Sequence, residues 1–110
     1  ITGFSVNMVS GAGTRSGVPA TEYAQQFLFG FTKKFKVLKK YTVPPQNGYQ
    51  ALGLRYSGDN QGVTTVVNIL TVANDREDIL YILMFEAPEK IWDAEWEKGR
   101  VLMNQFALGV

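Results

Sequence analysis

Four strand-like segments follow one another between residues 36 and 87, and only short turns separate them. The segments cover residues 36–43, 49–57, 63–73 and 79–87, and their β-branched and apolar residues are typical of strands. In the first turn Asn47 and Gly48 tolerate positive φ, and "GDNQG" is typical of a hairpin connection. Because hairpins join antiparallel strands, this succession predicts an antiparallel sheet.

A further strand and a helix are expected before these segments. "GFSVNMVS" (3–10) alternates between apolar and polar residues as a strand does. Thr21 is expected to cap a helix, because its hydroxyl can accept a hydrogen bond from a free amide of the first turn. The apolar residues that follow recur at three- and four-residue steps and line one helix face: Ala24, Phe27, Leu28, Phe31 and Phe35.

The last part of the chain predicts a second amphipathic helix. Pro88 fits the first turn of that helix, where a missing amide hydrogen costs nothing. The stripe expected to face the sheet consists of Trp92, Trp96, Gly99, Met103 and Phe106. The predicted fold is therefore one α+β domain over residues 1–110, with a central antiparallel sheet covered by an early and a C-terminal helix. The nearly continuous apolarity of residues 79–87 predicts a strand covered on both faces.

The composition excludes most catalytic machineries. The chain of 110 residues has no cysteine and no histidine, which removes thiol nucleophiles, imidazole-based triads and zinc sites built on these ligands. It contains no S-x-x-K or G-x-S-x-G nucleophile motif either. We therefore expect no enzymatic activity, no cofactor and no metal site. A chain that begins with Ile1 is expected to be processed or trimmed.

Electrostatics and hydropathy narrow the classes of partner. A net charge of +1 argues against nucleic acid as a partner. The longest apolar run, residues 79–85, is far too short to span a bilayer, so membrane association is expected only through partners. Protein surfaces remain the expected partner class.

Trp92 and Trp96 lie four positions apart and admit two interpretations. They can form the inner face of the last helix, because aromatic stripes at helical spacing usually pack in a core. They can also line a ligand pocket between this helix and the sheet. We favour core packing and keep the pocket as the alternative.

A basic cluster follows the first helical segment. It contains Lys33, Lys34, Lys36, Lys39 and Lys40, with aromatic residues between them. The cluster can be a solvated helix end or a surface that docks onto an acidic protein partner. Arg15, in the glycine-rich segment 10–17, is a further candidate for a partner contact.

Two other patterns favour ordinary surface roles. The glycines of segment 10–17 miss the register of a dinucleotide-binding loop, so we expect a flexible surface loop there. Glu89, Asp93 and Glu97 lie one turn apart and form a stripe that is expected to be solvated.

The C-terminal part of the chain resembles the PsbP-like family, whose fold is shared with the Ran-binding nuclear import factor Mog. The resemblance is carried by "TVVNILTVANDREDILYILMFEAPEKIWDAEWEKGRVLMNQFAL" within residues 64–108. Its matching parts are a strand from Leu80 to Met84, Ala87-Pro88, Trp92-Asp93 at the start of the last helix, and Gln105-Phe106. The first strand also looks like that of the family.

This resemblance implies a Mog/PsbP-like α/β/α sandwich and a non-enzymatic accessory or scaffold subunit. Such a subunit docks onto a larger protein assembly, of which a photosystem in the thylakoid lumen is the leading example. A bacterial periplasm or cell surface is the alternative location. The alternative functions are an extracytoplasmic domain, secreted or lipid-anchored, that binds a small ligand, and an adaptor of the Ran-binding kind.

Overall fold

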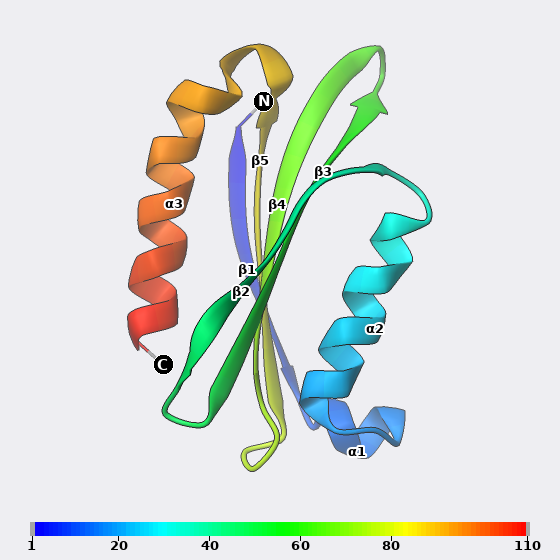
Figure 1. Ribbon diagram of the computed structural model, residues 1–110, viewed down its shortest axis with the longest axis vertical. Coiled ribbons are helices and arrows are strands. Elements are labelled where there is room, and N and C mark those ends of the chain that lie inside the picture. The colour runs from blue at the N-terminus through cyan, green and yellow to red at the C-terminus, as the bar shows by residue number, and fades with distance from the viewer. Residues whose placement is uncertain (1, 110) are drawn as a thin grey trace.

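The structure, a computed structural model, describes the backbone of residues 2–109 and the side chains of residues 2–106. The elements in chain order are β1 (Gly3–Ser10), α1 (Ala12–Ser16), α2 (Ala20–Thr32), β2 (Lys36–Gln46), β3 (Tyr49–Asn60), β4 (Val63–Asn74), β5 (Ile79–Pro88), the 3₁₀ helix η1 (Glu89–Ile91) and α3 (Trp92–Gly109). The strands form one sheet in the order β1-β5-β4-β3-β2, and every neighbouring pair is antiparallel. Helices α2 and α3 lie on opposite sides of this sheet (Figure 1). The predicted α+β class, with an antiparallel sheet covered by an early and a C-terminal helix, is confirmed.

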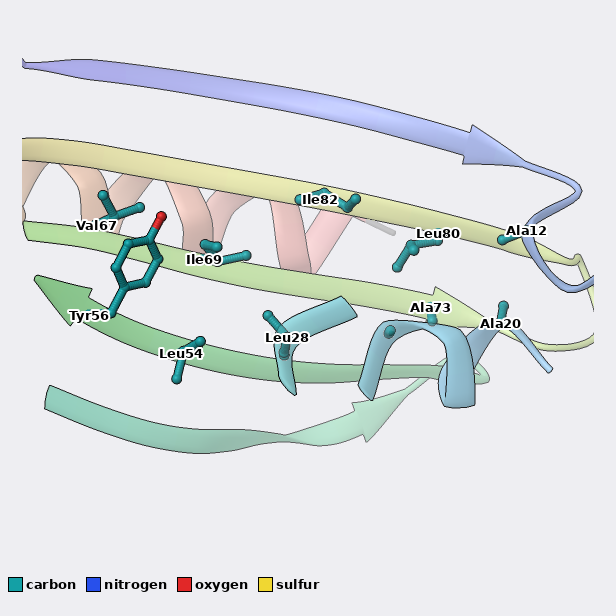
Figure 2. Close-up of a cluster of buried hydrophobic side chains, with 11 residues drawn as sticks. Ala12, Ala20, Leu28, Leu54, Tyr56, Val67, Ile69, Ala73, Leu80 and Ile82 are labelled. Carbon is teal, nitrogen blue, oxygen red and sulfur yellow. The ribbon is translucent and has the colours of Figure 1, made fainter. Parts of the chain in front are cut away.

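The sheet face beneath α2 holds the first hydrophobic core. Leu54 of β3, Ile69 of β4 and Leu80 of β5 are almost completely buried there, and Leu28 of α2 packs in the same cluster. Figure 2 shows these side chains on one side of three adjacent strands, with α2 alongside. The helical period of α2 and the two-residue period of the strands bring these positions together.

The opposite face packs against α3. Trp92 and Met103 are buried in this second core, and Trp96 and Phe106 are partly buried against it, so the predicted stripe faces the sheet. Gly99 lets the helix approach closely, because a Cβ there would lie only 2.6 Å from the ring of Phe85. The interpretation of the tryptophans as packing residues is therefore confirmed for Trp92.

Strand β5 is buried on both faces, as its apolarity predicts. Leu80 and Ile82 contribute to the core beneath α2, whereas Leu83 and Phe85 contribute to the core beneath α3. A strand between two helical layers has no solvated face, so its side chains do not alternate in polarity. Strand β5 is also the element that pairs with β1 and brings the first strand into the sheet.

Strand β2 is longer than the sequence predicts. The expected segment ended before Pro44, but β2 continues to Gln46 through both Pro44 and Pro45. It is an edge strand, paired only with β3, and its register shifts between Val43 and Gln46. Proline is tolerated there because one side of an edge strand needs no amide donors.

The predicted helix starts and one helix end are wrong by a few residues. Pro19, not Thr21, is the N-cap residue of α2. The amide and the hydroxyl of Thr21 instead donate hydrogen bonds of 2.8 and 3.0 Å to the carboxylate of Asp75. Pro88 ends β5 and precedes η1, and Phe35 lies beyond the end of α2. A carboxylate distant in the sequence thus binds the amide and hydroxyl of Thr21, while the amide of Tyr23 in the first turn donates to the backbone carbonyl of Pro19.

Segment 10–17 is not the flexible loop that its glycines predict, since it contains α1. The carboxylate of Asp78 accepts hydrogen bonds from the amide of Gly13 (2.6 Å) and from the amide and hydroxyl of Thr14 (3.2 and 2.7 Å). The hydroxyl of Thr14 and the amide of Gly13 lower the pKa of Asp78 below 3.8. The β4–β5 turn therefore anchors the first turns of both α1 and α2.

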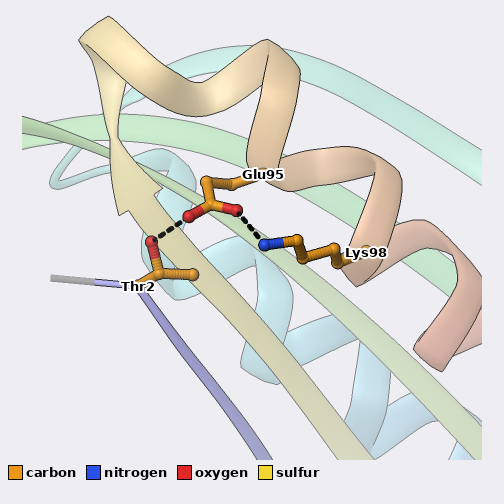
Figure 3. Close-up of polar contacts among 3 residues, drawn as sticks. All are labelled: Thr2, Glu95 and Lys98. Atoms are coloured by element: carbon orange, nitrogen blue, oxygen red, sulfur yellow. Dashed lines mark hydrogen bonds and ion pairs between the residues drawn. The ribbon is translucent and has the colours of Figure 1, made fainter.

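The start of the chain is tied to α3 on the other face. Glu95 of α3 accepts a hydrogen bond from the hydroxyl of Thr2 (3.4 Å) and forms an ion pair with Lys98 (3.1 Å) (Figure 3). The Glu95 side of α3 therefore faces β1, whereas its Arg100 side faces the β2 edge of the sheet.

Candidate functional site

Trp92 and Trp96 stack on one another and carry the guanidinium group of Arg55. Their ring centroids are 5.2 Å apart at an interplanar angle of 13°. The guanidinium carbon of Arg55, on β3, lies 5.1 Å from the Trp92 ring centroid and 4.6 Å from that of Trp96. An arginine over an indole face is stabilised by the ring quadrupole, by about 0.5–2 kcal/mol according to its desolvation. The two tryptophans therefore pack in the second core and also hold the Arg55 guanidinium in place.

A buried amide orients this arginine. Asn68 of β4 is fully buried, and its Oδ1 accepts a hydrogen bond of 3.3 Å from Nε of Arg55. Its Nδ2 donates to the phenol oxygen of Tyr41 (2.7 Å) and to the sulfur of Met103 (3.3 Å). One asparagine thus connects β2, β3 and α3. Burial raises the pKa of Tyr41 despite its hydrogen bond from Asn68 and the nearby charge of Arg55, so the phenol is neutral near pH 7.

These groups line an open cleft between α3 and the β2–β3 edge of the sheet, which we call the Arg55 cleft. Its volume is about 230 Å³. The lining residues are Lys39, Tyr41, Val43, Arg55, Leu70, Trp96, Arg100, Met103 and Asn104. Three of these residues are cationic, and the walls between them are aromatic and aliphatic.

The charge of Arg55 is not paired with a carboxylate among the side chains that the structure describes. Among the side chains of residues 2–106, no carboxylate lies within ion-pair distance of Arg55, whereas Arg100 pairs with Glu97 at 3.0 Å. Burial lowers the pKa of Arg55 from its ordinary value, and the electrostatic interactions with Tyr41 and Asp93 act in the opposite direction. Arginine nevertheless stays protonated in proteins. The cleft therefore presents a partly desolvated cation to any group that enters it.

The structure divides the predicted lysine cluster among different surfaces. Lys39 lies opposite Arg55 in the β2–β3 register and lines the Arg55 cleft. Lys40 lies opposite Leu54 and lines a separate hollow between α2 and β2. Lys33 and Lys34 follow α2, and Lys36 begins β2. Only Lys39 of the five therefore shares a site with Arg55.

Arg15 lies far from the lysines. It belongs to α1, which lies at the N-terminal end of α2, whereas Lys33 and Lys34 follow the C-terminal end of α2 (Figure 1). The amides of α1 that a phosphate would need are already hydrogen-bonded to Asp78. The amides of Gly13 and Thr14 are therefore not free to bind a phosphate, as they would be in a nucleotide-binding loop.

The predicted acidic stripe begins in η1 with Glu89 and continues into α3 with Asp93 and Glu97. Glu89, Asp93 and Glu97 are exposed, and Glu97 pairs with Arg100. Over the residues that the structure describes, no group of three or more acidic side chains is arranged to hold a metal ion. In the same part of the chain, no helix has the length and apolarity needed to cross a membrane.

A second hollow lies on the opposite face, between α2 and β2. It has a volume of about 410 Å³ and is lined mainly by apolar groups, including Leu28, Phe29 and Leu52, with Lys40 at its margin. This hollow holds no buried polar network comparable with that of Asn68. The Arg55 cleft therefore remains the better candidate site.

Sequence reasoning missed Arg55, Asn68 and Tyr41. A signal for two of them was present, because Arg55 and Asn68 interrupt apolar strands at positions that face a helix. A polar residue at an inward position needs a partner, and here each is the partner of the other. Only the cross-strand register shows that they meet.

Comparison with known proteins shows similarity in structure but not in sequence. No protein-family model matches the chain, and no curated protein matches it. The crystal structure of PA94 from Pseudomonas aeruginosa, a protein of unknown function described as a candidate regulator, is similar, with a TM-score of 0.71. The similarity covers 93% of this chain and 69% of that chain at 13% sequence identity. At this identity the likeness concerns the fold alone.

Proposed function

We propose that this chain is a non-enzymatic docking domain that binds an acidic segment of a larger protein assembly in the Arg55 cleft. The observation that carries the proposal is the position of Arg55. Its guanidinium group is held on two indoles and an asparagine, but no carboxylate of the described side chains neutralises it. A partly buried cation gains most from a partner carboxylate that it can bind in a charge-assisted, two-pronged manner.

Neighbouring charges support an anionic partner. Lys39 and Arg100 lie in the same cleft, and Glu97 offsets only Arg100. A partner whose acidic side chains follow this edge meets a complementary field, which favours both specificity and fast association. Tyr41 and Trp96 offer apolar contact to the stem of an acidic residue.

The size of the cleft favours a protein segment over a small ligand. Ligand pockets usually enclose about 300–1,000 Å³ and surround most of their ligand. The Arg55 cleft is smaller, at about 230 Å³, and is partly open to solvent. A small carboxylate ligand with a flat apolar part remains the second candidate, favoured by the aromatic walls at Tyr41 and Trp96.

The proposal extends to the kind of assembly through the resemblance of residues 64–108 to the PsbP-like family. On that basis the sheet and its two helices form a Mog/PsbP-like sandwich. The assembly is an extracytoplasmic complex such as a photosystem in the thylakoid lumen, with a bacterial periplasm or cell surface as the alternative. The helices on opposite faces of an antiparallel sheet agree with this sandwich. Detection of the intact protein in isolated thylakoid lumen, or its absence there, tests the location.

Tryptophan fluorescence tests the docking site directly, because both tryptophans of the chain contact Arg55. The probe is a hexaglutamate peptide, and hexaglutamine and acetate are the controls. We expect a saturable change in emission with hexaglutamate alone. Replacing Arg55 by glutamine should weaken binding by about tenfold or more, since a hydrogen bond between charged groups contributes roughly 1.5–3 kcal/mol.

Matched lysine variants make the test specific. Lys39→Gln should weaken binding of hexaglutamate, whereas Lys40→Gln, one position along the strand but in another hollow, should not. Equal thermal unfolding midpoints of the variants would exclude a folding defect. Binding of acetate with the same saturation would favour the small-ligand function instead. Equal loss of binding in Lys39→Gln and Lys40→Gln would contradict the assignment to the cleft.

A further inference from the structure

The two edges of the sheet differ in their protection against pairing with another strand. Strand β2 carries Lys36, Lys39 and Lys40, contains Pro44 and Pro45, and has two register irregularities. Charges, prolines and bulges are the features that keep an edge strand from adding further strands. The β2 edge is therefore protected.

Strand β1 has none of these features over its eight residues, "GFSVNMVS". It contains no charged residue and no proline, and it pairs with β5 in an unbroken register from Gly3 to Ser10. Its outer edge is thus a regular row of backbone groups. An edge of this kind is a template for a further strand.

The side chains of β1 also leave apolar surface uncovered. Val6 and Met8 are 41% and 58% exposed, although they point to the same sheet face as α3, which covers their β5 partners Leu83 and Tyr81. Leu102 of α3 is also exposed, at 41%. Helix α3 therefore covers the centre of this face and leaves its β1 margin open.

We propose that the β1 edge pairs with the β1 strand of a second copy of this chain, which makes one continuous ten-stranded sheet in a symmetric dimer. A neutral strand can pair with a copy of itself without bringing like charges together. It has no charged side chain that could form an ion pair with an acidic or basic partner. Closed two-fold dimers are also the commonest symmetric assembly.

The symmetry restricts the register of such a pair. Two antiparallel copies of β1 are related by a two-fold axis perpendicular to the sheet, so the α3 faces of both copies lie on the same side. Directly opposed residues of antiparallel strands share a face. Val6 then faces either Val6 or Met8 of the copy, and both registers bring exposed apolar side chains together.

Sedimentation and light scattering of the purified chain test the proposal. We expect a dimer that dissociates on dilution. The variants Val6→Lys and Met8→Lys should be monomers, because a lysine on β1 would protect this edge as the lysines of β2 protect the other. The matched control is Val63→Lys, because Val63 is 50% exposed at the start of β4, away from the β1 edge. A monomer at all concentrations, or a dimer that Val6→Lys and Met8→Lys leave unchanged, would overturn the proposal.

Cysteine cross-linking provides a second readout that does not depend on destabilising a strand. Because the chain contains no cysteine, Val6→Cys and Asn7→Cys each introduce a single thiol in β1. The two copies of residue 6 face each other in one register and the two copies of residue 7 in the other. Mild oxidation should convert one of these two variants to a disulfide-linked dimer, whereas Val63→Cys should remain monomeric. Cross-linking of neither β1 variant beyond that of Val63→Cys would also overturn the proposal. These results do not depend on hexaglutamate binding, since the Arg55 cleft lies near the opposite edge of the sheet.

Discussion

The buried amide of Asn68 donates a hydrogen bond of 2.7 Å to the phenol oxygen of Tyr41, two strands away in the sheet. The same side chain accepts from Arg55 on the strand between them. Asn68 is completely buried, so water cannot replace either contact. This small polar network therefore sets the position of the cation in the candidate site.

Asn68→Ala should destabilise the protein and release Arg55. Loss of a buried hydrogen-bonding group that leaves its partners unsatisfied costs about 1–3 kcal/mol. Tyr41→Phe should lower the free energy of unfolding by less, because the phenol is only partly buried. The two changes remove a shared contact, so the double variant should lose less free energy of unfolding than the two single variants together, as measured by urea unfolding. Additive costs would show that Tyr41 and Asn68 are not coupled.

Gly53→Ala should destabilise the domain by about 1–3 kcal/mol through overpacking. The ring of Tyr41 lies directly on Gly53 across the β2–β3 pair, and a Cβ at this position would overlap it. The control is Gly30→Ala, where nothing lies within 4 Å of the added Cβ. Because Gly30 is inside α2, that change should stabilise by up to about 1 kcal/mol. Equal effects of the two variants on the free energy of unfolding would contradict the close approach at Gly53.

Trp92→Ala and Trp96→Ala should lower the free energy of unfolding by different amounts. Trp92 is only 8% exposed, and removal of a large buried side chain costs about 3–5 kcal/mol. Trp96 is more exposed, so its replacement should destabilise the protein less. The same replacement removes the ring that lies nearer to Arg55. We therefore expect Trp96→Ala to remain folded in chemical denaturation while it loses affinity for hexaglutamate. Unfolding of both variants to the same extent would argue against this division.

Asp78→Asn should change how stability depends on pH. The hydrogen bonds from α1 lower the pKa of Asp78 below 3.8, so the ionised carboxylate stabilises the folded state above that pH. This contribution disappears as the pH falls through the lowered pKa. The wild type should therefore have a higher unfolding midpoint than Asp78→Asn at pH 7, and the difference should shrink in acid.

The control for this experiment is Asp59→Asn. Asp59, near the end of β3, accepts a hydrogen bond of 3.2 Å from the hydroxyl of Thr64 on the neighbouring strand β4. Its replacement should leave most of the acid dependence intact. A difference between the wild type and Asp78→Asn that stays constant from pH 7 into acid would mean that Asp78 acts without its charge.

Local patterns predict much of the fold. The first strand is confirmed at residues 3–10, and the other strands begin where expected. Asn47 and Gly48 have positive φ, as the turn prediction requires. These features depend on residues close in the chain, whose periodicity and turn chemistry are visible in the sequence.

The errors have a common physical cause. Thr21 is not the cap, segment 10–17 is not a flexible loop, and Pro44 does not end its strand. In the first two cases a carboxylate of the β4–β5 turn, more than fifty residues away, supplies the hydrogen bonds. In the third, the position of β2 at the edge of the sheet removes the need for an amide.

By itself the sequence determined the strand succession, the amphipathic last helix and the absence of thiol and imidazole chemistry. Periodicity and composition suffice for these, because they are properties of single segments. Only the tertiary structure decided that Arg55 contacts two indoles, that Lys39 and Lys40 line different hollows, and that β1 is an unprotected edge. Each of these depends on which strands are neighbours and in what register, and the interactions that select them join residues far apart in the chain.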